Sequence, residues 1–238
     1  RHRRRDEGVA DAAVEGALAG ARALRLHLVG LLASGRGFAW ERDGRVWIVD
    51  PANPSPTPFL DISAEVGGWR DHGMLGFALH PNFVNNGYFY VLYVVDQHHL
   101  VNCNSSQPGA AVCGPGYNPA TNAYFEATIG RLTRYRAVMP AGDANYARAT
   151  TVDYSSRKVL IGNTQAIGMS NAAYPNPPLP ASQIDRAGCP ILYESHGVGS
   201  LMFGQDGTLH ASCGDGASYS TTDGGSVSHT YFADALAL

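Results

Sequence analysis

The stretch that decides the fold reads SHGVGSLMFGQDGTLHASCGDG and occupies residues 195–216. Its apolar positions, with a Gln-Asp-Gly turn in the middle, predict a β-hairpin with strands at residues 200–203 and 208–213. The Asp-Gly pair favours a tight reversal because glycine reaches positive φ without a Cβ clash. His196 precedes the first strand and Asp215 follows the second, so the sequence predicts that both lie at one end of the hairpin.

Two further hairpins are predicted nearer the N-terminus. The first joins residues 38–42 to residues 45–50 through Asp43-Gly44, and the second joins residues 75–80 to residues 88–96. Other expected elements are strands at residues 59–62, 129–138 and 157–161, and a proline-rich linker at residues 51–58. The pattern predicts an all-β fold.

The hairpins recur at a spacing that is typical of a β-propeller. Gly37-Phe38-Ala39 returns as Gly76-Phe77-Ala78, 39 positions later, close to the roughly 40–50 residues of one propeller blade. The third hairpin begins much later, at Leu201, and two non-repetitive segments, residues 93–128 and 162–191, account for the excess. We therefore expect about two complete blades and the first hairpin of a third.

Composition agrees with a turn-rich β-protein. The 238 residues include 28 Gly and 14 Pro but only 16% charged residues, and 45% are hydrophobic. The formal net charge of -3 gives no reason to expect nucleic acid or an anionic membrane as a partner.

Residues 1–36 differ from the rest of the chain. They begin with a basic run, and between residues 9 and 32 apolar side chains such as Leu24 and Leu28 recur at helical intervals. Charged residues interrupt this apolar stretch, so it is a poor candidate for a membrane span or a signal peptide. We expect a helical or poorly ordered N-terminal extension, followed by a partial β-propeller over residues 37–238.

The four cysteines allow three pairings, which the sequence leaves open. Cys103 and Cys113 bracket a Gly/Pro/Ser-rich loop that a disulfide could close in an oxidising compartment. Cys213 lies in a predicted strand and is expected to be a small buried hydrophobic residue. No cysteine or histidine spacing completes a set of metal ligands, so no metal site is predicted in this chain.

Five motifs together resemble the glucose/sorbosone dehydrogenase family, six-bladed β-propellers that include soluble quinoprotein sugar dehydrogenases. The motifs are HGVGSLMFGQDG (residues 196–207), GDG (214–216), GMLGFALHPNF (73–83), NGYFYV (86–91) and GRLTRY (130–135). The resemblance implies pyrroloquinoline quinone and calcium as cofactors and a sugar as substrate. It also implies that the chain is the N-terminal half of a longer enzyme, with about three of its six blades.

The resemblance assigns roles to individual residues. His196 matches the general base that removes the proton of the sugar's anomeric hydroxyl, and Asp215 matches a carboxylate that orients this base. Asp71 stands where the family has Gln or Glu near the cofactor, and Ser200 stands where the family has a polar or basic residue that could contact it. On the residues alone, the alternatives are a histidine that satisfies a turn carbonyl, a second Asp-Gly turn and a surface-loop carboxylate.

The family's basic residues that hold the quinone, and its calcium ligands, belong to later blades that this chain lacks. The chain is therefore expected to be inactive on its own. Arg131 and Arg134 alternate with Leu132 and Tyr135 and are predicted to face outward from a blade. The family resemblance and a Cys103 to Cys113 bridge would agree with a periplasmic or extracellular location.

A second class of function stays open. Related β-propellers occur as extracellular domains that bind a protein or a carbohydrate without catalysis, and fold alone does not separate the two classes. His196 and Asp215 at one hairpin end favour the enzyme. The missing cationic residues and the long loops at residues 93–128 and 162–191 favour the binding domain.

Overall fold

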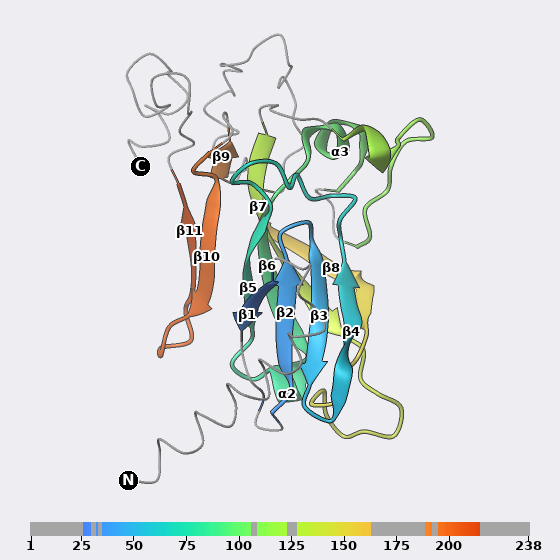
Figure 1. Cartoon of the computed structure of the whole chain (residues 1–238), viewed down its shortest axis with the longest axis vertical. Helices are drawn as coiled ribbons and strands as arrows, with labels where there is room; N and C mark the ends of the chain where they lie inside the picture. Colours follow the sequence, from blue (N-terminus) through green and yellow to red (C-terminus); the bar gives the residue numbers. More distant parts are fainter. Residues whose placement is uncertain are drawn as a thin grey trace.

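The computed structural model describes residues 26–29, 32, 35–105, 109–122, 128–162, 189–191 and 195–214. Within these ranges the chain forms antiparallel sheets with two short helices and one turn of 3-10 helix (Figure 1). The predicted β character is confirmed. None of the described helices has the length and hydrophobicity to cross a membrane.

The first sheet has four strands in chain order. They are β1 (Leu26–Val29), β2 (Gly37–Glu41), β3 (Arg45–Asp50) and β4 (Asn53–Asp61). The predicted hairpin of β2 and β3 is confirmed. The helical prediction is wrong at residues 26–29, because pairing with β2 supplies backbone partners and overrides the helical spacing. The earlier part of the predicted helical extension lies outside the described residues.

The proline-rich linker prediction is also wrong, since most of it belongs to β4. Pro54, Pro56 and Pro58 recur every second residue along this strand. β4 is the last strand of its sheet, and its pairing with β3 is irregular around residues 54–56. Edge strands and irregular pairing are where prolines, which lack an N–H donor, are tolerated in a sheet.

The second sheet follows the first after a connection of twelve residues, 62–73. Its strands are β5 (Met74–Leu79), β6 (Tyr88–Val94), β7 (Thr128–Ala137) and β8 (Val152–Ile161), with β9 (Cys189–Ile191) paired to β7. The connections contain α2 (Phe83–Asn86), α3 (Gln97–Asn102) and the 3-10 turn η1 (Pro119–Thr121). The predicted hairpin of β5 and β6 is confirmed, and β8 begins five residues before the predicted strand at residues 157–161.

The third sheet is the hairpin predicted within residues 195–216. It consists of β10 (Val198–Phe203) and β11 (Leu209–Cys213), close to the predicted bounds. β10 packs on β5, and a Cβ added at Gly76 would lie 2.8 Å from Cβ of Leu201. Glycine at this position therefore lets the two strands approach closely.

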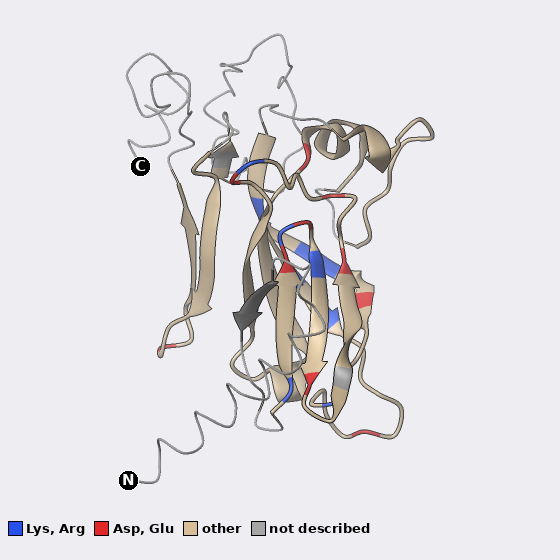
Figure 2. Cartoon of the chain, in the orientation of Figure 1, with Lys and Arg blue, Asp and Glu red and all other residues tan. Residues whose placement is uncertain are grey.

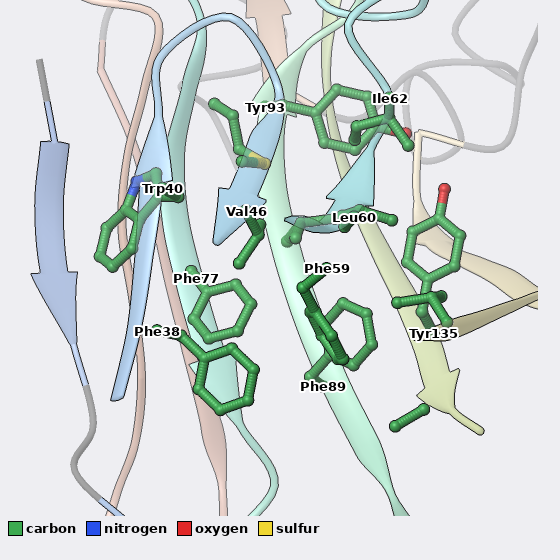
Figure 3. Packing of buried hydrophobic residues seen from close by; sticks show 14 of the residues in the cluster. Phe38, Trp40, Val46, Phe59, Leu60, Ile62, Phe77, Phe89, Tyr93 and Tyr135 are labelled. Atoms are coloured by element: carbon green, nitrogen blue, oxygen red, sulfur yellow. The ribbon is translucent and has the colours of Figure 1, made fainter. Parts of the chain in front are cut away.

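The three sheets pack face to face in chain order, and alternate residues of β6 serve the two interfaces. Phe89, Val91 and Tyr93 face the first sheet, whereas Leu92 and Val94 face the β10–β11 hairpin. The core between the first two sheets is aromatic (Figure 3). Its ring centroids lie 5.6 Å apart for Phe38 and Phe77, 5.7 Å for Phe77 and Phe89, and 5.1 Å for Phe59 and Phe89.

The predicted repeat joins strands that are not equivalent. Phe38 lies in the second strand of its sheet, whereas Phe77 lies in the first strand of the next sheet. The equivalent first strands are β1 and β5, which begin at residues 26 and 74. The sequence repeat missed this register because β1 carries a helical spacing.

The described cysteines form two disulfides, Cys103–Cys113 and Cys189–Cys213. The prediction that Cys213 is a small buried hydrophobic residue is wrong, because Cys213 is exposed and disulfide-bonded. β9 pairs with β7 while the β10–β11 hairpin covers the same sheet, and this brings Cα of Cys189 to 6.0 Å from Cα of Cys213. Two disulfides indicate an oxidising environment.

Arg131 is buried, which contradicts the outward orientation predicted for it. Residues 131 and 134 are an odd number of positions apart, so their side chains leave opposite faces of β7. Arg131 is 0% exposed and faces the first sheet, as Tyr135 does. Figure 2 shows acidic and basic residues interspersed over the described chain, many of them at strand ends and turns.

Candidate functional site

His196 is an exposed side chain at the entrance to β10. Its backbone is left-handed, with φ 47°, although it is not a glycine. This conformation costs a non-glycine residue about 1–2 kcal/mol, so the surrounding structure must hold it. The residues on both sides of His196 show how this is done.

A glycine pair closes the hairpin end beside His196. The backbone N–H of Gly214 donates to the carbonyl oxygen of Gly197 at 2.6 Å. A Cβ at Gly214 would overlap the carbonyl group of His196. An open depression lies at this end, lined by His196, Gly197, Val198, Gly199, Ser212, Cys213 and Gly214. The glycines therefore allow the backbone on both sides of this hairpin end to pack closely.

Ser195 joins this hairpin to the loop before β5. Its hydroxyl donates to Oδ2 of Asp71 at 2.7 Å, and Ser195 itself is 1% exposed. Next to this bond, His72 is buried, and a Cβ at Gly197 would lie 3.4 Å from Cδ2 of its ring. The loops that precede the first strands of the second and third sheets are therefore in direct contact.

The loop that carries Asp71 is held from the first sheet. The Arg42 guanidinium donates to the carbonyl oxygens of Arg70 and of Gly68, the latter at 3.1 Å. The backbone N–H of Met74 donates to the carbonyl oxygen of Arg42 at 2.8 Å. A Cβ at Gly73 would overlap the Arg42 side chain, so only glycine permits this contact.

Backbone strain is concentrated in these two loops. Among the described residues, Arg70 and His196 are the non-glycine residues with positive φ, at 46° and 47°. Arg70 precedes Asp71, and His196 follows Ser195, so the two strained residues flank the Ser195–Asp71 bond. A hydrogen bond to a charged group contributes about 1.5–3 kcal/mol, which is enough to offset the strain at one such residue.

The other predicted site residues have different positions. Asp215 lies outside the described residues, so its proximity to His196 stays a prediction. Ser200 is exposed on β10, and its backbone N–H donates to Oγ of Ser212 at 2.8 Å. Ser200 is not among the described residues that line the depression. Asp71 is brought to the hairpin end, where Ser195 occupies one of its oxygens.

An exposed imidazole can accept a proton from a bound ligand, and the open depression beside His196 gives a ligand access to it. No Lys or Arg belongs to the described lining of the depression. The described lining therefore provides no cation for an anionic ligand.

One group of three possible metal ligands occurs among the described residues, at His99, Cys103 and Cys113. Both sulfurs belong to the same disulfide, which removes the thiolates that a metal would need. The sequence prediction named no metal ligand, and this group supplies no thiolate in the oxidised chain.

Sequence reasoning missed the function of Ser195 as a link between loops. Ser195 was part of the quoted stretch, but its partner Asp71 is 124 positions away. The only local signal was a small polar residue directly before a histidine in a glycine-rich turn. Such a residue is common in turns, so the pattern alone does not single it out.

A second buried polar cluster joins the sheets away from His196. Oε1 of Glu65 accepts hydrogen bonds from Tyr93 at 2.6 Å and from Arg131 and Arg157, each at 2.7 Å. Burial alone would raise the pKa of Glu65, but Arg157 and Arg131 lower that pKa to about 2. Burial, followed by the charge of Glu65, raises the pKa of Tyr93 to about 12.

Comparisons with known proteins connect the chain to a small group of distant relatives. No protein-family model matches it. It is 27% identical to the HIPL2 protein of Arabidopsis thaliana over 198 residues, which are 79% of this chain and 25% of that protein. It is 28% identical to the HIPL1 protein of the same plant, covering 76% of this chain and 22% of that protein. The chain thus spans about a quarter of the length of these relatives.

A shorter match links the chain to the human Hedgehog-interacting protein, at 37% identity over 78 residues, or 29% of this chain and 11% of that protein. Among solved structures, the PQQ-bound aldose sugar dehydrogenase of Streptomyces coelicolor aligns with 81% of this chain and 39% of its own. Its TM-score is 0.41 and its identity 15%. A putative glucose dehydrogenase of Thermus thermophilus aligns with 81% of this chain and 40% of its own chain. Its TM-score is 0.41 and its sequence identity is 19%. The two solved structures are named as sugar dehydrogenases, the class of protein that the motifs resemble.

Proposed function

We propose that this chain is part of a quinoprotein sugar dehydrogenase with a β-propeller fold, in which His196 acts as the general base. The observation that carries the proposal is the position of His196. Its imidazole is exposed at the end of β10, in a strained backbone conformation, beside a depression with a glycine-rich lining. Strained residues cluster at functional sites because the surrounding structure has to hold them.

In this proposal the imidazole of His196 takes the proton from the anomeric hydroxyl of the sugar. Pyrroloquinoline quinone, when bound, supplies an acceptor for the hydride that leaves the same carbon. Loss of a proton and a hydride turns a cyclic aldose into its lactone. A positioned base of this kind accelerates the reaction by a factor of about 10²–10⁴. Asp215 is proposed to orient the imidazole from the far end of the hairpin.

Asp71 and Ser200 are proposed as residues that contact the quinone on this side of its site. The carboxylates of the quinone need cations, and the described lining supplies none. We therefore expect the cationic residues and the calcium ligands to come from parts of the protein beyond this chain. This agrees with the quarter of the relatives' length that the chain covers.

A binding domain without catalysis is the second candidate. It is favoured by the lack of a cation in the described lining and by the similarity to a protein named for its interaction with Hedgehog. In that case the same surface would contact a protein or a carbohydrate. A periplasmic or extracellular location is proposed for both candidates, since both need the oxidising environment that the disulfides indicate.

The test uses the full-length protein that contains this chain, supplied with pyrroloquinoline quinone and calcium. Reduction of a redox dye is followed with several aldoses. We expect activity in the wild type and a loss of about 100-fold or more in His196→Ala. His210→Ala is the matched control, because His210 is an exposed histidine on β11 of the same hairpin, near its other end. If the intact protein takes up no quinone, the binding domain replaces the enzyme.

A further inference from the structure

The loop before β5 and the loop before β10 are joined by a specific hydrogen bond between Ser195 and Asp71. Ser195 is buried, yet its hydroxyl reaches the carboxylate of an exposed residue, Asp71, from a loop 124 positions earlier. Two loops joined only by apolar packing could slide. A charged hydrogen bond of 2.7 Å fixes their relative position more tightly, because it demands both a distance and a direction.

This bond continues into the first sheet. Arg42 fixes the carbonyl oxygens of Gly68 and Arg70, directly before Asp71. Asp71 in turn accepts from Ser195, which precedes His196. The chain of contacts therefore runs from the turn between β2 and β3, through the loop before β5, to the residue before the candidate base.

We infer that Ser195 and Asp71 are positioning residues: their hydrogen bond holds the backbone of His196 in its left-handed conformation and thereby fixes the direction of the imidazole. The inference assigns to Asp71 a use other than a direct contact with cofactor. It deepens the proposed function, on which its kinetic consequence rests, but the position of the His196 ring can be measured without any catalysis.

The experiment follows the His196 ring by NMR in the full-length protein labelled with ¹³C at histidine. The His196 peak is identified by its disappearance in His196→Ala. We expect one sharp peak in the wild type, and a broadened or split peak in Ser195→Ala and in Asp71→Asn. Ser195→Thr keeps the hydroxyl and should restore the single peak.

Ser63→Ala is the matched control, because Ser63 donates to Oδ1 of Asp61 at 2.6 Å in a turn outside the His196 site. It removes a Ser–Asp hydrogen bond of the same kind and should leave the His196 peak unchanged. Thermal unfolding of each variant separates a role in the stability of the fold from a role in the position of His196. A lower melting temperature with an unchanged His196 peak in Ser195→Ala and Asp71→Asn would mean a purely structural bond and would overturn the inference.

If the full-length protein supplied with pyrroloquinoline quinone and calcium oxidises a sugar, the rate of that oxidation is a second measurement. Misplacement of a base by about 1 Å can cost about 100-fold in rate, so Ser195→Ala should lower kcat by about that factor while KM changes little. Failure of the proposed function and failure of this inference are distinguishable. A protein without dehydrogenase activity removes the former, whereas an unchanged His196 peak in Ser195→Ala removes the latter.

Discussion

Oε1 of Glu65 lies 2.7 Å from Nη1 of Arg131, although the two residues are 66 positions apart. Glu65 follows the last strand of the first sheet, and Arg131 belongs to β7 of the second. Both side chains are almost fully buried, with 6% and 0% exposed. Their contact therefore joins two sheets through charges that water does not reach, which makes the stability of the fold depend on pH.

Stability should fall in acid as Glu65 gains a proton. In the unfolded chain the carboxyl titrates near its ordinary pKa of 4.5, whereas the folded chain keeps it ionised down to about 2. Between these values the unfolded state binds more protons, so the free energy of unfolding falls as pH falls through this window. The loss is about 3–4 kcal/mol at most, since one pKa unit corresponds to about 1.4 kcal/mol.

Urea unfolding of wild type and Glu65→Gln between pH 7 and pH 2 measures this contribution. The variant should be less stable at pH 7 and should show a flatter decline in acid. Asp61→Asn serves as the control, because Asp61 is 57% exposed in its pair with Arg45 and such pairs contribute little. Parallel curves for wild type and Glu65→Gln would contradict the prediction.

Removing Arg131 should destabilise the chain strongly. Arg131→Met leaves Glu65 in a buried position with one cation fewer, and breaking a buried ion pair costs about 3–5 kcal/mol. Arg134→Met, on the opposite face of the same strand, removes a stacking contact of 4.2 Å with the Tyr88 ring and should cost about 1 kcal/mol or less. Chemical denaturation of both variants gives the comparison.

The double variant Glu65→Gln with Arg131→Met tests whether the two residues act together. Residues of one ion-pair network give non-additive changes in the free energy of unfolding. We expect the double variant to lose less stability than the two single variants combined. Strict additivity would mean that the two side chains contribute independently.

The Cys103–Cys113 disulfide should stabilise the same cluster from the loop side. Ser105, two residues after Cys103, is 0% exposed and accepts from Nη1 of Arg131 at 2.8 Å. The double variant Cys103→Ser with Cys113→Ser should lower the free energy of unfolding by about 2–4 kcal/mol. Peptide mapping without reductant should give the pairs 103–113 and 189–213, and any other pairing would refute the assigned bridges.

The hairpins were predictable because their signals are local. The turn at Asp43-Gly44 between β2 and β3, and the one at Asp206-Gly207 between β10 and β11, combine an Asp-Gly pair with adjacent apolar alternation. Long-range pairings carry no such signal. β1 is a strand because β2 pairs with it, and Cys189 meets Cys213 because two sheets pack together.

The residues of the candidate site also differ in whether the sequence near them carries a signal. His196 was singled out because residues 196–207 resemble a family motif, and its role as a base stays a prediction. Its connection to Asp71 through Ser195 could not be predicted, since it depends on how the second and third sheets stack. The outward prediction for Arg131 failed for a different reason. Arg131 and Tyr135 are four positions apart and share the buried face of β7. The prediction placed Arg131 outward because arginine is usually exposed, and it did not apply this alternation of side chains.

The close approach of β5 and β10 gives the last prediction. An added methyl group at Gly76 would lie 2.8 Å from Cβ of Leu201 and 2.9 Å from Cβ of Leu92, so the hairpin would have to move away from the second sheet. Gly76→Ala should therefore lower the free energy of unfolding by about 1–3 kcal/mol, the usual cost of overpacking a core. Gly116→Ala is the control, because no atom lies within 4 Å of the Cβ it would add. Since His196 precedes β10, separated from it only by Gly197, Gly76→Ala should also broaden the His196 ring peak. A sharp, unshifted peak would show that the loop of His196 is positioned independently of this interface.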